Sequence, residues 1–406
     1  MKSIAILLWS PQISGGTNVV FEHALSLEKS GYDVTIVMEE ALNANDIAWF
    51  PKARNFNWKT YEQAAEHEFD IVMATWWRTA FSLHRISARR HVFFVQSIES
   101  YFYPEVEVPL RQLVDSTYLF PVNYVTEATW IQEHLSQEYG HSPKLVKNGI
   151  NKAYFCDNGP VLQDKVSGKL RVLVEGPLGV DFKNVERTIE LCRQSECDEI
   201  WLLTLSDVDS YQGVDRVFSK VPIDKVGEIY RSCDVLVKLS KVEGMFGPPL
   251  EMFHCGGTSV TYDVTGYDEY IKNDVNGLVV KMDDEQGVID AINRLKNDSK
   301  KLAELKAQAK LTADSWPDWR QSGEEFQNAM KCIFDEGMST SKGLLNASTR
   351  CAWKHYEYAE MLRLQKQIGV RNLTFKKYVN LLKEKCPRLY FRIKDIWFSI
   401  MKTFVS

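Results

Sequence analysis

Short apolar runs of strand length alternate with helical patterns along most of this chain. The first run is Ile4–Leu8, a helical pattern follows from Val19 to Lys29, and the next run is Asp33–Val37. A strand, a helix and a strand at this spacing form a βαβ unit, whose parallel sheet is covered on both faces. The alternation therefore predicts an α/β fold.

The alternation occurs in two sets, separated by a polar stretch with Gly and Pro at residues 157–168. Further strands are predicted at 71–74, 91–95, 119–125 and 144–146 in the first set, and at 170–174, 199–205, 216–217, 234–239, 258–262 and 277–280 in the second. Two doubly wound, Rossmann-like domains leave a cleft between them, and such sheets bind ligands at the carboxyl ends of their strands.

The predicted domains span residues 1–155 and 156–320. Residues 321–338 are predicted to form a helix that crosses back to the first domain, and residues 339–406 a helical tail. The length of 406 residues, with 45% hydrophobic and 25% charged residues, is that of an ordinary globular protein and excludes a disordered chain. The eight cysteines form no CxxC pair and indicate a reducing compartment. With no signal peptide or membrane-spanning run, we expect a cytoplasmic protein.

The net charge of −5 is unevenly distributed. Residues 351–406 hold twelve Lys or Arg and four Asp or Glu, so this stretch carries +8 and the rest of the chain −13. Residues 373–405 mix these cations with aromatic and aliphatic side chains, as basic amphipathic helices on anionic membranes do. The alternative is a helix packed on the body or on a protein partner. Nucleic acid is not expected, because no nucleic-acid module accompanies the charge.

The most specific motif follows the predicted strand 234–239 and runs from Glu243 through Gly244, Met245, Phe246 and Gly247 to Pro248, Pro249, Leu250 and Glu251. Two consecutive prolines suit the first turn of a helix, so Glu251 is expected inside that helix and Glu243 before it. Backbone N–H groups of the turn and the helix N-terminus would form an anion site. The alternative is a helix cap with two solvated acids.

This stretch resembles the E-x7-E region of the family 4 glycosyltransferases, which are retaining, metal-independent enzymes with the two-domain GT-B fold. Further matches occur in the expected order at Gly15-Gly16, Asn148–Asn151, Lys183, Gly266 and Asn276–Val280. The resemblance covers about residues 1–335. Val95 to Glu99 and Glu175 to Pro177 resemble the bacterial surface-polysaccharide rhamnosyltransferases.

The resemblance implies a role for each matching residue. Glu243 contacts the transferred sugar, Glu251 holds the ribose, and Lys183 neutralises the diphosphate leaving group. Gly15 and Gly16 allow close approach to a phosphate. Lys183 could instead be a surface lysine, and the two glycines an ordinary turn.

The chain also departs from the family pattern. Gly176-Pro177 stands where Gly-Arg is usual, so a second cation for the diphosphate is missing there, and Arg187 is our candidate substitute. Gln96 stands near the place of a common histidine. Because an amide side chain does not titrate, any proton transfer is assigned to the leaving phosphate.

Candidate acceptor residues follow two buried strands: Trp76, Trp77 and Arg78 after one, and Gln96 and Glu99 after the other. Aromatic faces beside polar groups suit stacking on sugar rings, and they equally suit a packed loop. No metal or other cofactor is expected. Asp207 and Asp209 form a D-x-D string, but it follows a strand of the second domain and no His pair has ligand spacing.

The expected function is transfer of a hexose or deoxyhexose from a nucleoside diphosphate sugar, with dTDP-rhamnose as one candidate, to a growing and lipid-linked cell-surface glycan. An anionic membrane surface is the further partner expected of the tail, on the inner face of the cell membrane. The alternatives are a sugar-nucleotide epimerase or phosphorylase on the same fold, and a non-catalytic scaffold that binds nucleotide or glycan.

Overall fold

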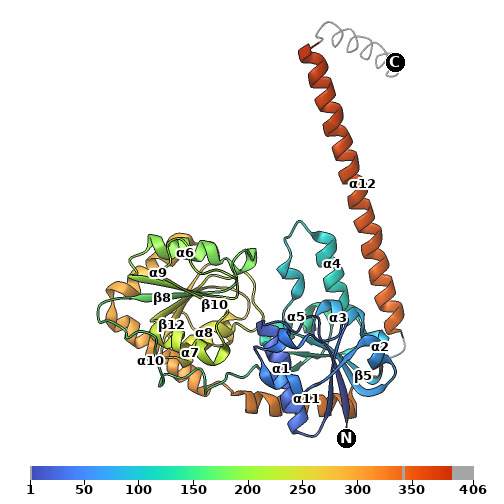
Figure 1. Ribbon diagram of the computed structural model, residues 1–406, viewed down its shortest axis with the longest axis horizontal. Coiled ribbons are helices and arrows are strands. Elements are labelled where there is room, and N and C mark those ends of the chain that lie inside the picture. The colour runs from blue at the N-terminus through green and yellow to red at the C-terminus, as the bar shows by residue number, and fades with distance from the viewer. Residues whose placement is uncertain (1, 341–342, 386–406) are drawn as a thin grey trace.

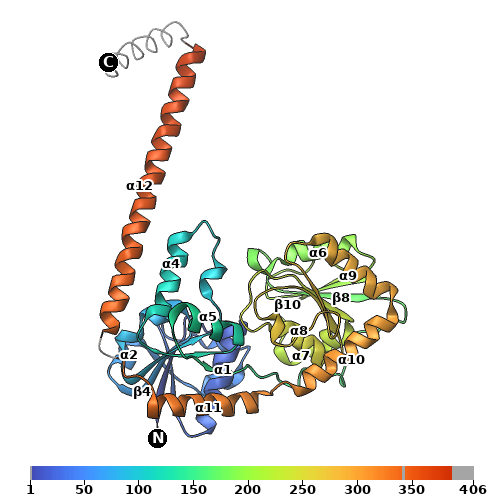
Figure 2. The same ribbon diagram turned by 180° about the vertical axis from the view of Figure 1, so that it is seen from behind.

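A computed structural model describes residues 2–340 and 343–385 of the chain. It shows two α/β lobes side by side and one long helix that projects from the first lobe (Figure 1; Figure 2 gives the view from behind). Each lobe is built around one parallel sheet.

The first sheet has seven strands in the order β3-β2-β1-β4-β5-β6-β7, all paired in parallel. Its strands are Ser3–Leu7 (β1), Asp33–Met38 (β2), Asn57–Thr60 (β3), Glu68–Ala74 (β4), Ser87–Val95 (β5), Asn123–Thr126 (β6) and Lys144–Leu145 (β7). Successive side chains of a strand point to opposite faces. Ile4 and Ile6 accordingly enter one core, and Ala5 and Leu7 the other.

Helices cover both faces of this sheet. They are Gly15–Lys29 (α1), Tyr61–Ala65 (α2), Trp77–Phe81 (α3), Val108–Ser116 (α4) and Thr129–Tyr139 (α5), with short 3-10 turns at Ala44–Ile47 (η1), Pro51–Asn55 (η2), Leu83–Arg85 (η3), Glu99–Phe102 (η4) and Thr117–Leu119 (η5). The core on the α1 side also takes in side chains from a helix much later in the chain, described below.

The second sheet has six parallel strands in the order β10-β9-β8-β11-β12-β13. Its strands are Arg171–Glu175 (β8), Glu199–Thr204 (β9), Arg216–Ser219 (β10), Val235–Lys238 (β11), Thr258–Tyr262 (β12) and Leu278–Val280 (β13). Around it lie Asp181–Lys183 (η6), Val185–Gln194 (α6), Ile223–Ser232 (α7), Gly247–His254 (α8), Tyr267–Glu269 (η7), Glu285–Asn297 (α9) and Ser299–Ser315 (α10). The order 9-8-11-12 places β8 and β11, with their following loops, at the centre of the sheet.

The chain passes between the lobes twice, and the two crossings touch. Ile150 N–H donates to Pro317 O at 3.1 Å, and a β-carbon on Gly149 would come within 2.4 Å of the Trp319 nitrogen. Helix α11 (Trp319–Glu336) then lies along the first lobe against α1 (Figure 1). Phe326 is fully buried there. The two sheets lie within the two predicted domains, and α11 begins two residues before the predicted crossing helix; the domain boundaries stay predictions.

Helix α12 (Leu344–Lys385) starts against the first lobe and then leaves it (Figures 1 and 2). Leu344 is buried in the first-lobe core, and the Ser348 hydroxyl donates to Phe81 O at 3.0 Å. Within the next two to three turns, Trp353 and Tyr356 are exposed. Of the predicted basic segment 373–405, residues 386–405 lie outside the described residues. Among the helices that are described, none combines the length and apolarity needed to span a membrane.

Candidate active site

The motif of two glutamates surrounds the start of α8. Pro248 and Pro249 occupy the first turn of this helix, as expected. Gly244 lies against the first lobe, since a β-carbon there would stand 2.0 Å from the Gln96 carbonyl oxygen. The loop between β11 and α8 therefore forms part of the contact between the two lobes.

Glu243 is buried and paired with Lys183. The Lys183 ammonium donates to both carboxylate oxygens at 2.9 Å, although the two residues are 60 positions apart. Burial works to raise the pKa of Glu243, but Lys183 and Lys238 together hold it below its usual value. The structure thus joins two residues that the sequence selected separately, at the carboxyl ends of neighbouring strands.

Two charged residues that the sequence analysis did not select complete this cluster. Lys238 is the last residue of β11 and its ammonium lies 2.7 Å from a carboxylate oxygen of Glu175, at the end of β8. It also lies 3.8 Å from Glu243. A lysine at the end of the apolar run Val235–Leu239 was the available signal, because an ammonium in a buried strand needs a charged partner.

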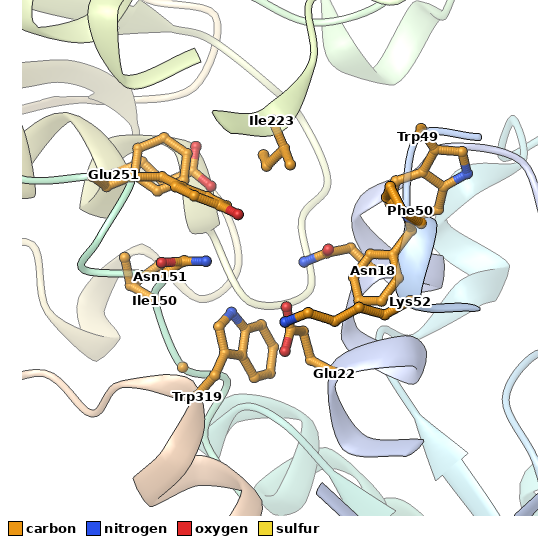
Figure 3. A pocket seen from close by; sticks show the side chains of 14 residues that line it. Asn18, Glu22, Trp49, Phe50, Lys52, Ile150, Asn151, Ile223, Glu251 and Trp319 are labelled. Carbon is orange, nitrogen blue, oxygen red and sulfur yellow. The ribbon is translucent and has the colours of Figure 1, made fainter. Parts of the chain in front are cut away.

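Glu251 lies in α8 and lines a cavity of about 130 Å³ between the lobes. Figure 3 shows Glu251 and Asn151 on one side of this cavity, with Asn18, Glu22 and Lys52 from the first lobe opposite. Burial, together with the nearby Glu175 carboxylate, raises the pKa of Glu251 to about 7. Lys183 and Glu243 are not among the described residues that line this cavity.

Gly15 and Gly16 open α1 directly after the loop that follows β1. Ser14 caps this helix by accepting from Thr17 N–H at 3.0 Å. A β-carbon on Gly16 would lie 3.1 Å from the side-chain oxygen of Gln96. The helix start, Gln96 and Gly244 of the second lobe therefore lie close together at the lobe contact.

A buried acid of the first lobe, Glu127, also faces the motif loop and was not predicted. One of its oxygens accepts from Met245 N–H at 3.3 Å, and Trp130 donates to Gly244 O at 2.9 Å. Burial raises the pKa of Glu127 to about 7. Its place directly after a strand of the first sheet was the signal.

The predicted anion-binding amides are partly engaged within the protein. The N–H of Met245 bonds to Glu127, and that of Gly247 to Met245 O at 2.9 Å. The side chain of Phe246 is fully buried in the second lobe. The N–H groups of Met245 and Gly247 therefore already have hydrogen-bond partners within the protein.

The candidate acceptor residues divide into two groups. Trp77 is buried, and its backbone N–H donates to the Glu99 carboxylate at 2.7 Å. Glu99 is itself buried, which raises its pKa well above its usual value. Both are packed in the lobe. Trp76 is half-buried and stacks on Phe102, and the exposed Arg78 lies over the Trp9 ring at 4.8 Å from its centre. Gln96 is half-buried and its amide donates to Thr75 O at 3.3 Å, so these three side chains keep some exposed surface.

Two other predicted groups lie away from the cluster. Arg187 pairs with Glu190 and Glu285, so the structure engages our candidate second cation elsewhere. Asp207 is exposed and pairs with Lys220 at 3.1 Å. Within residues 2–340 and 343–385, no three His, Cys, Asp or Glu side chains gather as a metal site.

Part of the second lobe matches a known protein family. Residues 211–312, which include β11, Glu243 and Glu251, match the family described as Glycosyl transferases group 1. The chain is a glycosyltransferase with the GT-B fold. No curated protein matches the sequence.

Solved structures are similar across most of the chain at low identity. Sucrose-phosphate synthase from Thermosynechococcus elongatus is 14% identical with a TM-score of 0.66, over 82% of this chain and all of that one. HepE from Anabaena, solved with UDP and glucose, is 14% identical with a TM-score of 0.64 over the same shares. WaaG, a glycosyltransferase involved in lipopolysaccharide biosynthesis, is 13% identical with a TM-score of 0.62, again over 82% and 100%.

Proposed function

We propose that this enzyme transfers a hexose or deoxyhexose from a nucleoside diphosphate sugar to a growing cell-surface glycan, as a retaining member of glycosyltransferase family 4. The observation that carries the proposal is the bonding of Lys183 to both oxygens of Glu243, at the lobe contact that also holds Gln96 and Gly16. A cation and a carboxylate held this way suit a departing diphosphate and an electron-poor sugar carbon.

In this mechanism the sugar C1–O bond to the diphosphate breaks, and the acceptor oxygen bonds to C1 on the same face. Lys183 stabilises the charge that develops on the diphosphate, and Glu243 the positive charge on the sugar ring. Gln96 cannot take up a proton, so the acceptor proton passes to an oxygen of the leaving diphosphate. Glu251, which lines the same cavity as Asn151, accepts hydrogen bonds from the ribose hydroxyls.

A thermal-shift panel of UDP, dTDP, GDP and ADP, each with magnesium and with chelator, tests this site. Ligand at about 100 times its dissociation constant stabilises a folded protein by roughly 2.7 kcal/mol. One nucleotide should stabilise the wild type in chelator, and Lys183→Ala and Glu251→Ala should each abolish the shift. A shift that requires magnesium, or none with any nucleotide, contradicts the proposal.

Donor sugar and stereochemistry need their own measurement. Once the preferred nucleotide is known, its sugar donors are tested for transfer, and dTDP-rhamnose is tried first if that nucleotide is dTDP. The NMR coupling constants of the product then give its anomeric configuration. Retention is expected. Inversion would remove the family 4 assignment while leaving the glycosyltransferase assignment in place.

We further propose that the acceptor is lipid-linked and that residues 373–405 bind an anionic membrane surface. The support is the basic and aromatic composition of this segment. Sedimentation with anionic and with neutral vesicles tests it, using a variant with Lys376, Lys377, Arg388 and Arg392 changed to Gln. Binding to anionic vesicles should be lost in the variant; equal binding to both vesicle types would refute the membrane role.

A further inference from the structure

A lysine lies buried at the end of a central strand of the second sheet. The side chain of Lys238 is 2% exposed, and its neighbours Val237 and Leu239 are fully buried. Removing an ammonium from water is costly unless it is paired and hydrogen-bonded. Lys238 meets this condition through Glu175, whose carboxylate oxygen lies at 2.7 Å and whose carbonyl oxygen lies at 3.2 Å.

Lys238 has a second carboxylate within reach, that of Glu243. The ammonium lies 3.8 Å from the Glu243 carboxylate oxygen that also accepts from Lys183. Burial works to lower the pKa of Lys238, but Glu175 and Glu243 more than offset it and raise the pKa. Negative and positive side chains thus alternate in one row, in the order Glu175, Lys238, Glu243 and Lys183.

The position of Lys238 also matters for the loop after β8. A β-carbon on Gly176 would lie 3.8 Å from the Lys238 ammonium and 3.9 Å from the Lys183 side chain. Pro177 follows where the resemblance leads one to expect an arginine, and Arg187 is paired with Glu190 and Glu285. The second positive charge beside Glu243 is therefore that of Lys238, which comes from the end of β11 and not from the loop after β8.

Lys183 has two tasks in the proposed function. It pairs with Glu243 in the structure, and it is assigned to the diphosphate during the reaction. If it moved to the diphosphate alone, Glu243 would stay buried without a counter-charge, and breaking a buried pair in this way is strongly unfavourable. An additional cation that remains next to Glu243 removes this obstacle.

We propose that Lys238, anchored by Glu175, is a positioning residue that keeps Glu243 charged and in place while Lys183 exchanges Glu243 for the diphosphate of the donor. This inference rests on the proposed function, because it needs a diphosphate at Lys183. Lys238 acts through Glu243 and Lys183, and it touches neither nucleotide nor sugar.

The test separates this role from a contribution to folding. Lys238→Met leaves the Glu175 carboxylate without its buried partner, so that variant can lose folding stability simply because the ion pair is broken. The double variant Lys238→Met/Glu175→Gln removes both charges of the pair. Glu175 raises the pKa of Glu251 and Lys238 lowers it, so removing both together has opposing effects on the charge of Glu251.

The measurement is the dissociation constant of the nucleoside diphosphate that stabilises the wild type most, and that of the matching monophosphate, by calorimetry. In the double variant, diphosphate affinity should fall by about tenfold or more, as coupling within one charge network allows, while monophosphate affinity stays within about twofold. A purely structural defect would weaken both alike. The control is Lys306→Met. Lys306 lies on α10 and pairs with Asp234 at 2.6 Å, and its loss should leave the ratio of the two dissociation constants unchanged.

The outcomes also distinguish this inference from the proposed function. If the wild type binds diphosphate more tightly than monophosphate and the double variant keeps that ratio, the inference about Lys238 is wrong and the function stands. If the wild type binds none of the nucleotides, the proposed function is wrong and the inference falls with it.

Discussion

Two carboxyl groups at the lobe contact, those of Glu251 and Glu127, have pKa values raised by burial to about 7. A buried acid of this kind is more stable protonated than charged. Near neutral pH each group is therefore divided between its two forms. Glu251 faces the cavity and Glu127 the motif loop, so their charge states bear on ligand binding and on the contact between the lobes, respectively.

Replacing Glu251 with Gln should flatten the pH dependence of stability. The folded protein holds this proton more tightly than the unfolded chain, whose carboxyl has the ordinary value of 4.5. Stability due to Glu251 is thus fully present below about pH 4.5 and is lost as pH rises through about 7. Glu251 keeps some exposed surface, which screens its charge and reduces the effect, so we expect the wild type to lose about 2 kcal/mol relative to Glu251→Gln across this window.

Urea denaturation of both proteins across this pH range measures the difference. Glu62→Gln, at an exposed position on α2, is the control and should show no such difference from the wild type. Parallel stability curves for the wild type and Glu251→Gln would show that Glu251 does not titrate in this window.

At the same scale, the sequence analysis selected Glu243, Glu251 and Lys183 as candidates, but not Lys238 and Glu175, which lie beside Glu243 and Lys183. Motif spacing is local information, and it correctly placed Glu251 inside α8 and Glu243 before it. Lys238 and Glu175 are 63 positions apart and meet only because β8 and β11 are neighbours in the sheet. Strand order is not encoded in either segment alone, so this pair could not be predicted.

At the scale of elements, the alternation of apolar runs predicted most strands, and its failures have local causes. Strand β3 has no apolar run because it is an edge strand of four residues that pairs only with β2. The predicted strand 119–125 begins late, at Asn123, because Leu119 belongs to a 3-10 turn and is 67% exposed, and Pro121 follows it. Helix α11 begins at Trp319, two residues before the predicted start, because Asp318 caps it by accepting from Gln321 N–H.

Helix α11 should be a major stabilising element of the first lobe. Phe326 is fully buried, stacks on His23 at 4.0 Å between ring centres, and meets Phe94 edge-on. Removing a buried phenylalanine side chain leaves a cavity, and Phe326→Ala should cost about 3–5 kcal/mol of unfolding free energy. Leu311→Ala on α10, where the side chain is 62% exposed, should cost less than about 0.5 kcal/mol.

Denaturant titrations of these two variants give the comparison. Equal effects of Phe326→Ala and Leu311→Ala would mean that α11 is not firmly packed on the first lobe. The second lobe would then be joined to the first mainly through the contacts of the motif loop.

For the whole molecule, the contact between the lobes is made by specific hydrogen bonds, ring stacking and an ion pair. It includes the bond from Met245 N–H to Glu127, that from Trp130 to Gly244, and stacking of Phe102 on Phe182 at 4.9 Å. Lys147 and Glu269 add an ion pair at 3.1 Å. The pairing of Lys183 with Glu243 lies entirely within the second lobe, so a donor bound there depends on this contact to meet the first-lobe residues Gly16 and Gln96.

Gly244→Ala should therefore separate catalysis from folding. The added methyl group would stand 2.0 Å from the Gln96 carbonyl oxygen, so the lobes must shift apart, while neither sheet is touched. We expect transfer to fall by about tenfold or more, which corresponds to an overpacking cost of about 1–3 kcal/mol at the contact. Unfolding of each lobe and nucleotide binding to the second lobe should change little.

Gly247→Ala is the matched control three positions on, because its methyl group would have its nearest neighbour, the Met245 sulfur, at 3.9 Å. Full activity in Gly244→Ala would show that the lobes need not approach as closely as this for transfer, and a loss of nucleotide binding in that variant would show that the donor site extends across the contact.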